Sequence, residues 1–202
     1  MPVALAAQGE PQKKITKAGQ ARAKMVAFRQ ADFPAGWVQQ PVPKNKKSES
    51  NPRCSYYNPD NSDLVEIGDY DSPDFNRADG SSISSSTGVF RTVHMATTAY
   101  RRLAVPLLGK CFAEIFRKGI TAPNSVTIFS SGTRQFPTLG DQSHAYRISA
   151  SVKTPAGRVR VAVDIVLFNK GAIDVAVIML GIGNPLPASL ETSLVGKLAA
   201  RA

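Results

Sequence analysis

The feature that most constrains the fold of this chain is a run of apolar segments in its second half, joined by short turn sequences. Segments with the composition of β-strands occupy residues 125–131, 145–153, 158–168 and 172–180. The second and third are linked by Thr154-Pro155-Ala156-Gly157, and the third and fourth by Asn169-Lys170-Gly171. Links of this kind favour hairpins between antiparallel neighbours. The sequence therefore predicts an antiparallel sheet at the centre of the fold.

Helical segments flank these strands. Residues 98–118 carry apolar side chains at the i, i+3, i+4 spacing of a buried helix face, and Pro106 within them predicts a kink or two shorter helices. Thr16 can cap a helix that runs to about Gln30, and an amphipathic helix follows Pro187. Strands that are flanked by helices, without strict alternation, predict an α+β fold with helices packed against an antiparallel sheet.

The first half of the chain carries weaker signals. Residues 61–65, Asn-Ser-Asp-Leu-Val, have the composition of a helix cap and a short helix. Residues 81–95 are rich in serine and threonine with interspersed apolar side chains, and we expect a strand there. The serine run at 81–86 is polar, so we expect an edge strand or a loop for it. Residues 38–60 hold four prolines and few apolar side chains, and we expect a loop.

The first hairpin turn sets a register. If Lys153 faces Arg158, then Arg147 lies opposite Asp164, on the sheet face away from the apolar side chains of the same two strands. Asp164 then lies in a central strand. The sequence favours a structural ion pair between Arg147 and Asp164. The alternative is that Asp164 is a carboxylate on the floor of a cleft.

The second hairpin turn sets a register in the same way. Taking Asn169-Lys170-Gly171 as the turn pairs Phe168 with Ala172. This pairing puts Ala176 beside Asp164 and Asp174 beside Val166 in the neighbouring strand. We therefore expect the strand at 158–168 to be central, with partners on both of its edges.

The net charge of +10 raises the question of an acidic partner. The densest basic run, Lys44-Asn45-Lys46-Lys47, lies in an expected loop and lacks the interleaved aromatic residues or glycines of nucleic-acid binders. We expect no nucleic-acid partner, and a cytosolic nucleic-acid binder is the weakest alternative. Loose attraction to an anionic cell surface is compatible with the charge. No apolar run has the roughly 20 residues of a membrane span.

The N-terminus and the cysteines bear on export. Residues 1–15 begin with an apolar stub that contains Ala4-Leu5-Ala6 and continue as a polar run, like the end of a signal peptide or an ordinary disordered terminus. We expect residues 1–15 to be disordered and residues 16–202 to form a single domain. Cys54 and Cys111 fit one disulfide of an exported protein, and the alternative is two unrelated buried thiols.

Candidate catalytic groups are few. The two histidines, His94 and His144, lie outside any His-Glu-x-x-His zinc pattern, and the chain has no Gly-x-Ser-x-Gly elbow or Gly-x-x-x-x-Gly-Lys phosphate loop. We expect no metal and no cofactor, and structural or solvent-facing roles for both histidines. A secreted hydrolase that uses His94 or His144 is the main alternative function.

Six stretches, taken in order, resemble a group of exported actinobacterial proteins of poorly defined function. They are "ADFPAGW" at 31–37, "NPRC" at 51–54, "NSDL" at 61–64, "GKCF" at 109–112, "GDQSHAYRISASV" at 140–152 and "VAVDIVLFNKGAIDVAVIML" at 161–180. This group is similar to the extracellular sensor domains of PknH-type mycobacterial serine/threonine kinases and to small cell-envelope lipoproteins. The resemblance implies an antiparallel sheet with packed helices and a cleft for a ligand. It also favours export and a cystine.

The chain departs from these relatives in two respects. It has two cysteines where the kinase sensors have four, and we expect no kinase and no membrane span with it. No cysteine lies near residue 7, where a lipoprotein would be processed, so we expect simple secretion rather than a lipid anchor.

A non-catalytic ligand-binding or sensor-like module of the cell envelope is therefore the expected function. Its ligand would be a small molecule or a cell-envelope component. Trp37 and Tyr100 are candidate aromatic contacts, Arg134 and Arg147 could meet an anionic group, and Asp164 could lie in the cleft. For Trp37 the favoured alternative is simple packing, in which it clamps the first helix to the sheet.

Overall fold

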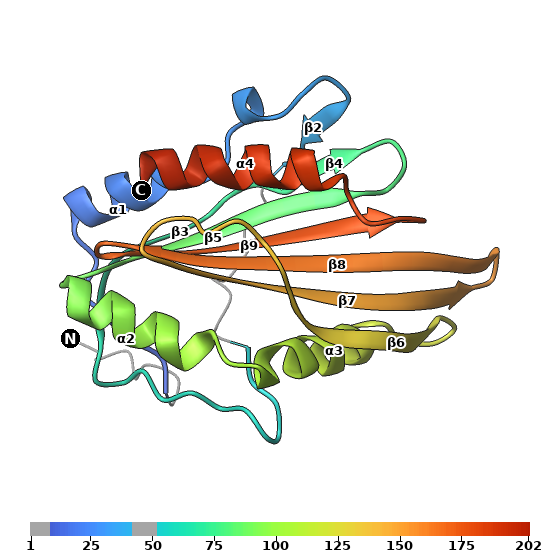
Figure 1. Cartoon of the computed structure of the whole chain (residues 1–202), viewed down its shortest axis with the longest axis horizontal. Helices are drawn as coiled ribbons and strands as arrows, with labels where there is room; N and C mark the ends of the chain where they lie inside the picture. The colour runs from blue at the N-terminus through green and yellow to red at the C-terminus, as the bar shows by residue number, and fades with distance from the viewer. Residues whose placement is uncertain (1–8, 42–51) are drawn as a thin grey trace.

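One sheet of nine strands forms the centre of the computed structural model, which describes residues 9–41 and 52–202 (Figure 1). The strand order is β1-β3-β5-β9-β8-β7-β6, and a branch of β2 and β4 joins it at β5. The strands are β1 (Gln12–Lys13), β2 (Trp37–Gln39), β3 (Val65–Asp71), β4 (Phe75–Arg77), β5 (Ser82–Phe90), β6 (Ser125–Arg134), β7 (Gln142–Thr154), β8 (Gly157–Lys170) and β9 (Ile173–Ile182). Every pairing except that of β1 with β3 is antiparallel.

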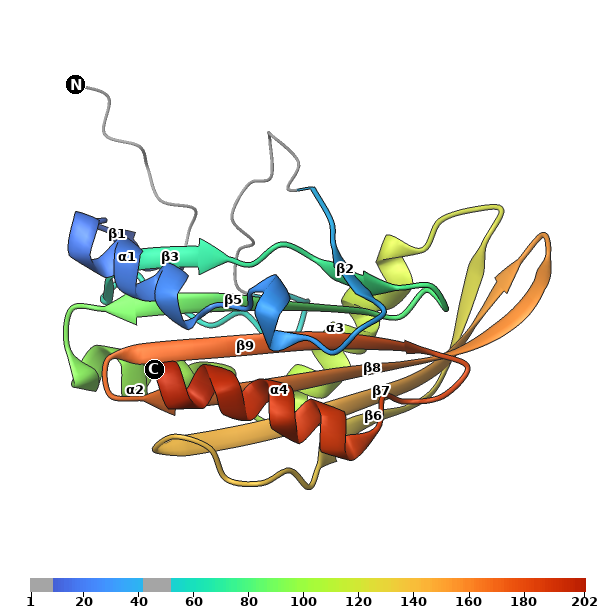
Figure 2. The same cartoon turned by 90° about the horizontal axis from the view of Figure 1, so that it is seen from above.

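Helices cover both faces of the sheet, which confirms the predicted α+β class. They are α1 (Lys17–Val26), the 3₁₀ turn η1 (Gln30–Asp32), α2 (Val93–Leu103), α3 (Leu107–Gly119) and α4 (Ala188–Arg201). In Figure 1, α1 and α4 lie on one face, here named the α4 face, and α2 and α3 lie on the other, the α2 face. Figure 2 shows α4 lying along β8 and β9. Each face has its own apolar core, with Val175 and Leu198 on the α4 face and Leu108 and Ile165 on the α2 face.

Helix boundaries follow the capping residues and the prolines. Thr16 Oγ accepts a hydrogen bond from the Gly19 N–H at 3.0 Å and caps α1 as predicted. The helix ends at Val26, earlier than expected, and the chain then turns so that Phe28 enters the core. The segment with Pro106 forms two helices, and Pro106 directly precedes α3. Within the described ranges, no helix is long and apolar enough to cross a membrane.

The register of the first hairpin agrees with the prediction. Lys153 pairs with Arg158, and Arg147 pairs with Asp164. Strand β8 lies between β7 and β9, so Asp164 is in a central strand. Because the turn is closed by a fixed number of residues, it determines every pair along the two strands.

The predicted register of the second hairpin is wrong by three residues. Phe168 faces Val175 and not Ala172, since β8 continues through Lys170 and only two residues form the turn. Gly171 in that turn has φ +57°, the left-handed conformation that tight two-residue hairpins require. A shift by an odd number of residues puts every side chain of β9 on the face opposite to the predicted one. Asp174 therefore lies on the α2 face.

Three predictions for the first half of the chain are also wrong. The strand expected over 81–95 ends at Phe90, and residues 93–95 belong to α2. The serine run belongs to β5, which is a central strand between β3 and β9. Its small hydroxyl side chains alternate between the two faces: Ser85 Oγ, on the α4 face, accepts a hydrogen bond from the Phe28 N–H at 3.2 Å, and Ser86 lies on the α2 face. Residues 61–65 form a turn that leads into β3 rather than a helix, and the Leu64 N–H donates to the Asn61 carbonyl at 2.9 Å.

The expected disorder of residues 1–15 is wrong in its second half. Residues 1–8 lie outside the described residues. Gln12 and Lys13 form β1, because the edge of β3 offers backbone partners: the Gln12 N–H donates to Leu64 O at 2.9 Å and the Lys14 N–H to Glu66 O at 2.8 Å. This short strand brings the N-terminal segment to the α2-face cavity described below.

Cys54 and Cys111 form a disulfide, as predicted, with their Cα atoms 5.7 Å apart. The bond ties the loop before β3 to the buried side of α3. Tyr57, which the sequence reading missed, anchors the same loop: its ring is buried and its hydroxyl donates to the Arg102 carbonyl at 3.0 Å. From loop entropy, the disulfide stabilises the fold by at most about 4 kcal/mol.

Candidate functional site

The structure separates the residues that the sequence singled out. Trp37 lies in the α4-face core, 4% exposed, with its ring 5.6 Å from that of Phe33. The Arg77 guanidinium lies over the indole, 5.4 Å from its centroid. These contacts match the packing alternative for Trp37, and they place it on the opposite face from Tyr100.

Arg134, Arg147 and Asp164 come together on the α4 face, where Glu191 of α4 joins them. Arg147 Nε and Nη2 donate to the two oxygens of Asp164 at 2.7 and 2.9 Å. Arg134 Nε lies 2.7 Å from Asp164 Oδ1, and its Nη2 donates to Glu191 Oε2. Arg147 Nη2 lies 3.6 Å from Glu191 Oε1. We name these four residues the α4-face ion cluster.

Charges within the α4-face ion cluster balance. Asp164 and Glu191 are 1% and 0% exposed, and each faces both guanidinium groups. Burial, together with the charge of Asp164, raises the pKa of Glu191 to about 7 despite the two arginines. The guanidinium groups that were candidates for an anionic ligand are thus engaged by carboxylates of the protein itself.

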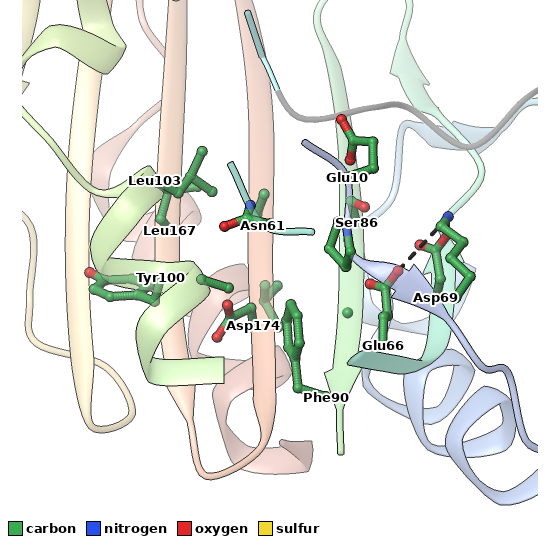
Figure 3. A pocket seen from close by; sticks show the side chains of 16 residues that line it. Glu10, Asn61, Glu66, Asp69, Ser86, Phe90, Tyr100, Leu103, Leu167 and Asp174 are labelled. Carbon is green, nitrogen blue, oxygen red and sulfur yellow. Dashed lines mark hydrogen bonds and ion pairs between the residues drawn. The ribbon is translucent and has the colours of Figure 1, made fainter. Parts of the chain in front are cut away.

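A cavity of about 120 Å³ lies on the α2 face, between α2 and strands β1, β3, β5, β8 and β9. Figure 3 shows its lining, with Tyr100 and Asp174 on one side and Glu66 and Asp69 on the other. The lining residues are Glu10, Pro11, Lys13, Asn61, Glu66, Asp69, Ser86, Gly88, Phe90, Ala99, Tyr100, Leu103, Leu167, Asp174, Val175 and Ala176. Four of them are acidic and one is basic, in a protein whose net charge is +10.

Asp174 provides a carboxyl group to this cavity from the start of β9. Its Oδ1 accepts a hydrogen bond from Asn169 Nδ2 at 2.7 Å, and among the described residues its Oδ2 has no hydrogen-bond or ion-pair partner. Burial raises the pKa of Asp174 to about 8, and the Asn169 bond only partly offsets this. The side chain therefore carries a proton near neutral pH.

Glu66 provides a second carboxyl group, from β3, and is 8% exposed. Lys13 Nζ lies 3.9 Å from its Oε2, beyond hydrogen-bonding distance, and is instead hydrogen-bonded to Asp69. Burial and the charge of Asp69 raise the pKa of Glu66 to about 8, although Lys13 acts in the opposite direction. The second carboxyl group is thus protonated near neutral pH for the same reason as Asp174.

The remaining wall of the cavity is largely apolar. Phe90, Leu103 and Leu167 form part of it, and Tyr100 contributes its ring. A hydrogen bond of 2.9 Å joins Tyr100 Oη to His144 Nδ1, and burial raises the pKa of Tyr100 well above its usual value. The cavity thus presents carboxyl groups beside a hydrocarbon surface, which suits a small ligand with one cationic and one apolar part.

The two histidines lie apart from these carboxyl groups. His94 is exposed in the first turn of α2, and His144 is exposed on β7 with Tyr100 as its partner. Across residues 9–41 and 52–202, no three His, Cys, Asp or Glu side chains gather in a way that could hold a metal ion. The hydrolase alternative stays a prediction.

Sequence reasoning found one residue of the cavity, Tyr100, and missed its carboxyl groups. Asp174 was placed in the wrong register, and Glu66 lies in a segment where the strand was not predicted. Glu191 carried a usable signal: it shares the helical stripe of Leu194, Val195 and Leu198. A charged residue on an apolar stripe predicts a buried ion pair.

Comparison with known proteins finds a similarity in structure but none in sequence. No family model and no curated protein matches the sequence. Among solved structures, the extracellular domain of PknH from Mycobacterium tuberculosis is similar, with a TM-score of 0.33 and 10% sequence identity. The match covers 67% of this chain and 62% of that domain. We therefore take the function from the geometry of the cavity.

Proposed function

We propose that this protein is a non-catalytic binding module of the cell envelope, and that its α2-face cavity binds a small cationic ligand. The observation that carries this proposal is the state of Asp174 and Glu66. Glu66 is buried and Asp174 is half-buried at the cavity. No cationic group of the described residues lies within hydrogen-bonding distance of either, and the nearest to Glu66 is Lys13 Nζ at 3.9 Å. Burying a carboxyl group without a cation is unfavourable, and a ligand ammonium group would provide the missing partner.

The lining limits what such a ligand can be. A volume of about 120 Å³ admits a short chain and excludes a sugar polymer or a folded peptide. The hydrocarbon wall of Phe90, Leu103 and Leu167 favours an alkyl segment beside the charged group. A primary amine or diamine with a short alkyl chain meets both conditions, and the ammonium group would replace the protons that Asp174 and Glu66 hold near neutral pH.

The disulfide supports a location outside the cytoplasm. Structural disulfides persist in oxidising compartments, and Cys54–Cys111 closes a loop that also lines the cavity through Asn61. The signal-like stub at Ala4-Leu5-Ala6 favours the same location. Together these features support secretion or residence in the cell envelope, where small amines are accessible ligands.

A thermal-shift comparison of three matched probes tests this function. Diaminobutane, butanediol and butanedioate share a four-carbon chain and differ in charge. We expect diaminobutane to raise Tm because it binds only the folded state, and the neutral and anionic probes to have no effect. A rise with butanedioate and none with diaminobutane would instead favour an anionic ligand and contradict the proposal.

A further inference from the structure

The β7–β8 hairpin carries a basic face at the end of the molecule farthest from the cavity. Lys153 and Arg158 are directly opposite each other, and Arg160 is opposite Ser151 one pair further along the same face. All three basic side chains are exposed. Figures 1 and 2 show this end of the hairpin extending beyond the helices.

These three cations have no acidic partner among the described residues. Residues 142–163, which form both arms of the hairpin end, contain no aspartate or glutamate. Like charges that face each other across a strand pair are destabilising. The fold therefore carries an unfavourable arrangement at this end that an external anionic surface would relieve.

The tip of the hairpin adds an uncharged, partly apolar surface to this basic face. Pro155, Ala156 and Gly157 form the exposed turn, and Val159, on the other face of β8, is 37% exposed. Further back, Phe129 of the edge strand β6 is 60% exposed. A soluble polyanion would use the cations alone. The apolar tip finds favourable contacts only where a polar boundary adjoins hydrocarbon, as in a lipid bilayer.

We propose that the end of the β7–β8 hairpin is a docking surface for an anionic lipid bilayer. The Pro155-Ala156-Gly157 turn enters the headgroup region, and Lys153, Arg158 and Arg160 contact lipid phosphates just behind it. The cavity residue Leu167 is nine positions along β8 from Arg158, which corresponds to about 30 Å of extended strand. Docking in this orientation keeps the cavity open to the surrounding solution.

Co-sedimentation with vesicles tests the docking surface. The full chain is mixed with vesicles of phosphatidylglycerol and phosphatidylcholine, or of phosphatidylcholine alone. We expect binding to the anionic vesicles only, with release at high salt. Replacing three cations together, as Lys153→Gln, Arg158→Gln and Arg160→Gln, should weaken binding by on the order of a hundredfold, at roughly tenfold or less for each cation near the surface.

A matched variant separates this site from the general positive charge. Lys17, Arg22 and Lys24 are exposed on α1, and changing all three to glutamine removes the same charge elsewhere. We expect this variant to bind anionic vesicles within about twofold of the unaltered protein, since these cations are remote from the docking surface. Equal loss of binding in the two triple variants would overturn the proposal.

A fluorophore on the turn reports whether the tip enters the bilayer. An Ala156→Cys variant labelled with an environment-sensitive dye should shift its emission to the blue with anionic vesicles. No binding to anionic vesicles, or hairpin-dependent binding to soluble polyphosphate without any binding to vesicles, would each overturn the bilayer assignment. An Asp174→Asn variant should dock normally, so the outcome is independent of the ligand that occupies the cavity.

Discussion

Two pairs of carboxyl groups, all buried except the half-buried Asp174, lie on opposite faces of the same sheet, and they differ in what surrounds them. On the α4 face, Asp164 and Glu191 meet two guanidinium groups. On the α2 face, Asp174 and Glu66 border a cavity, and within the described part of the chain neither is hydrogen-bonded to a cation. The same chemical group therefore serves two purposes: with a guanidinium partner it joins α4 to the sheet, and without one it offers a place for a ligand.

This difference explains why burial alone does not identify the site. Glu191 is more fully buried than Glu66, and burial raises the pKa of both. What distinguishes them is geometry: Arg134 is hydrogen-bonded to Glu191, whereas Lys13 lies 3.9 Å from Glu66 and is hydrogen-bonded to Asp69 instead. Removing a carboxyl group should therefore lower the free energy of unfolding strongly on the α4 face and little or not at all on the α2 face.

The largest expected effect is the loss of Asp164. An Asp164→Ala variant leaves two guanidinium groups with Glu191 as their one carboxylate, so the free energy of unfolding should fall by about 3 kcal/mol, the lower end of the range because Arg147 is one-third exposed. Urea denaturation measures this. The matched change, Asp174→Asn, should cost less than about 1 kcal/mol or stabilise the fold, because it buries no unpaired charge. An equal decrease in the free energy of unfolding for both variants would contradict the proposed difference between the two faces.

The next effect concerns the contact that positions Glu66. Helix α1 packs directly on β3, and a Cβ atom added at Gly19 would lie 2.2 Å from the Ile67 carbonyl oxygen. We expect Gly19→Ala to lower the free energy of unfolding by about 2–3 kcal/mol. Gly196→Ala in α4 is the control, since a Cβ there has nothing within 4 Å, and it should stabilise the fold by up to about 1 kcal/mol. Similar values for both variants would show that α1 has room to move.

A smaller effect is the pH dependence that the cavity imposes on stability. The pKa of Asp174 rises from an ordinary value of 3.8 to about 8 on folding, so between these values the folded state binds more protons than the unfolded state. Its contribution to stability is complete below about pH 4, declines as pH rises, and is lost above about pH 8. Asp174→Asn should flatten this decline, and Asp74→Asn, at an exposed site, should leave it unchanged. A decline that Asp174→Asn does not alter would show that Asp174 ionises normally.

Much of the fold could be read from the sequence because its signals are local. The Thr154-Pro155-Ala156-Gly157 turn and the alternation of β7 and β8 are enough to place Arg147 opposite Asp164. The second hairpin was misjudged because the strand continues through Asn169 and Lys170, whose polar side chains are typical of turns. With that register Asp174 was predicted on the wrong face, so the sequence did not indicate that Asp174 and Tyr100 line the same cavity.

The cavity could not be read from the sequence for a different reason. Its lining comes from β1, β3, β5, β8, β9 and α2, and pairings between β1 and β3, or between β5 and β9, join segments far apart in the chain. No short turn specifies those registers, so nothing local indicates that Glu66 and Asp174 share a cavity. Cys54 and Cys111 were a stronger signal, since two cysteines allow only one pairing.

Calorimetric titration of the protein with diaminobutane tests the central claim most directly. We expect binding that strengthens from about pH 6 to about pH 8 and releases protons, because the ammonium group replaces the protons on Asp174 and Glu66. Asp174→Asn should weaken it by about tenfold or more through loss of a charged partner, while Asp74→Asn should not change it. Absence of binding to the unaltered protein, or equal affinity in Asp174→Asn, would contradict the assignment of the cavity as a site for a cationic ligand.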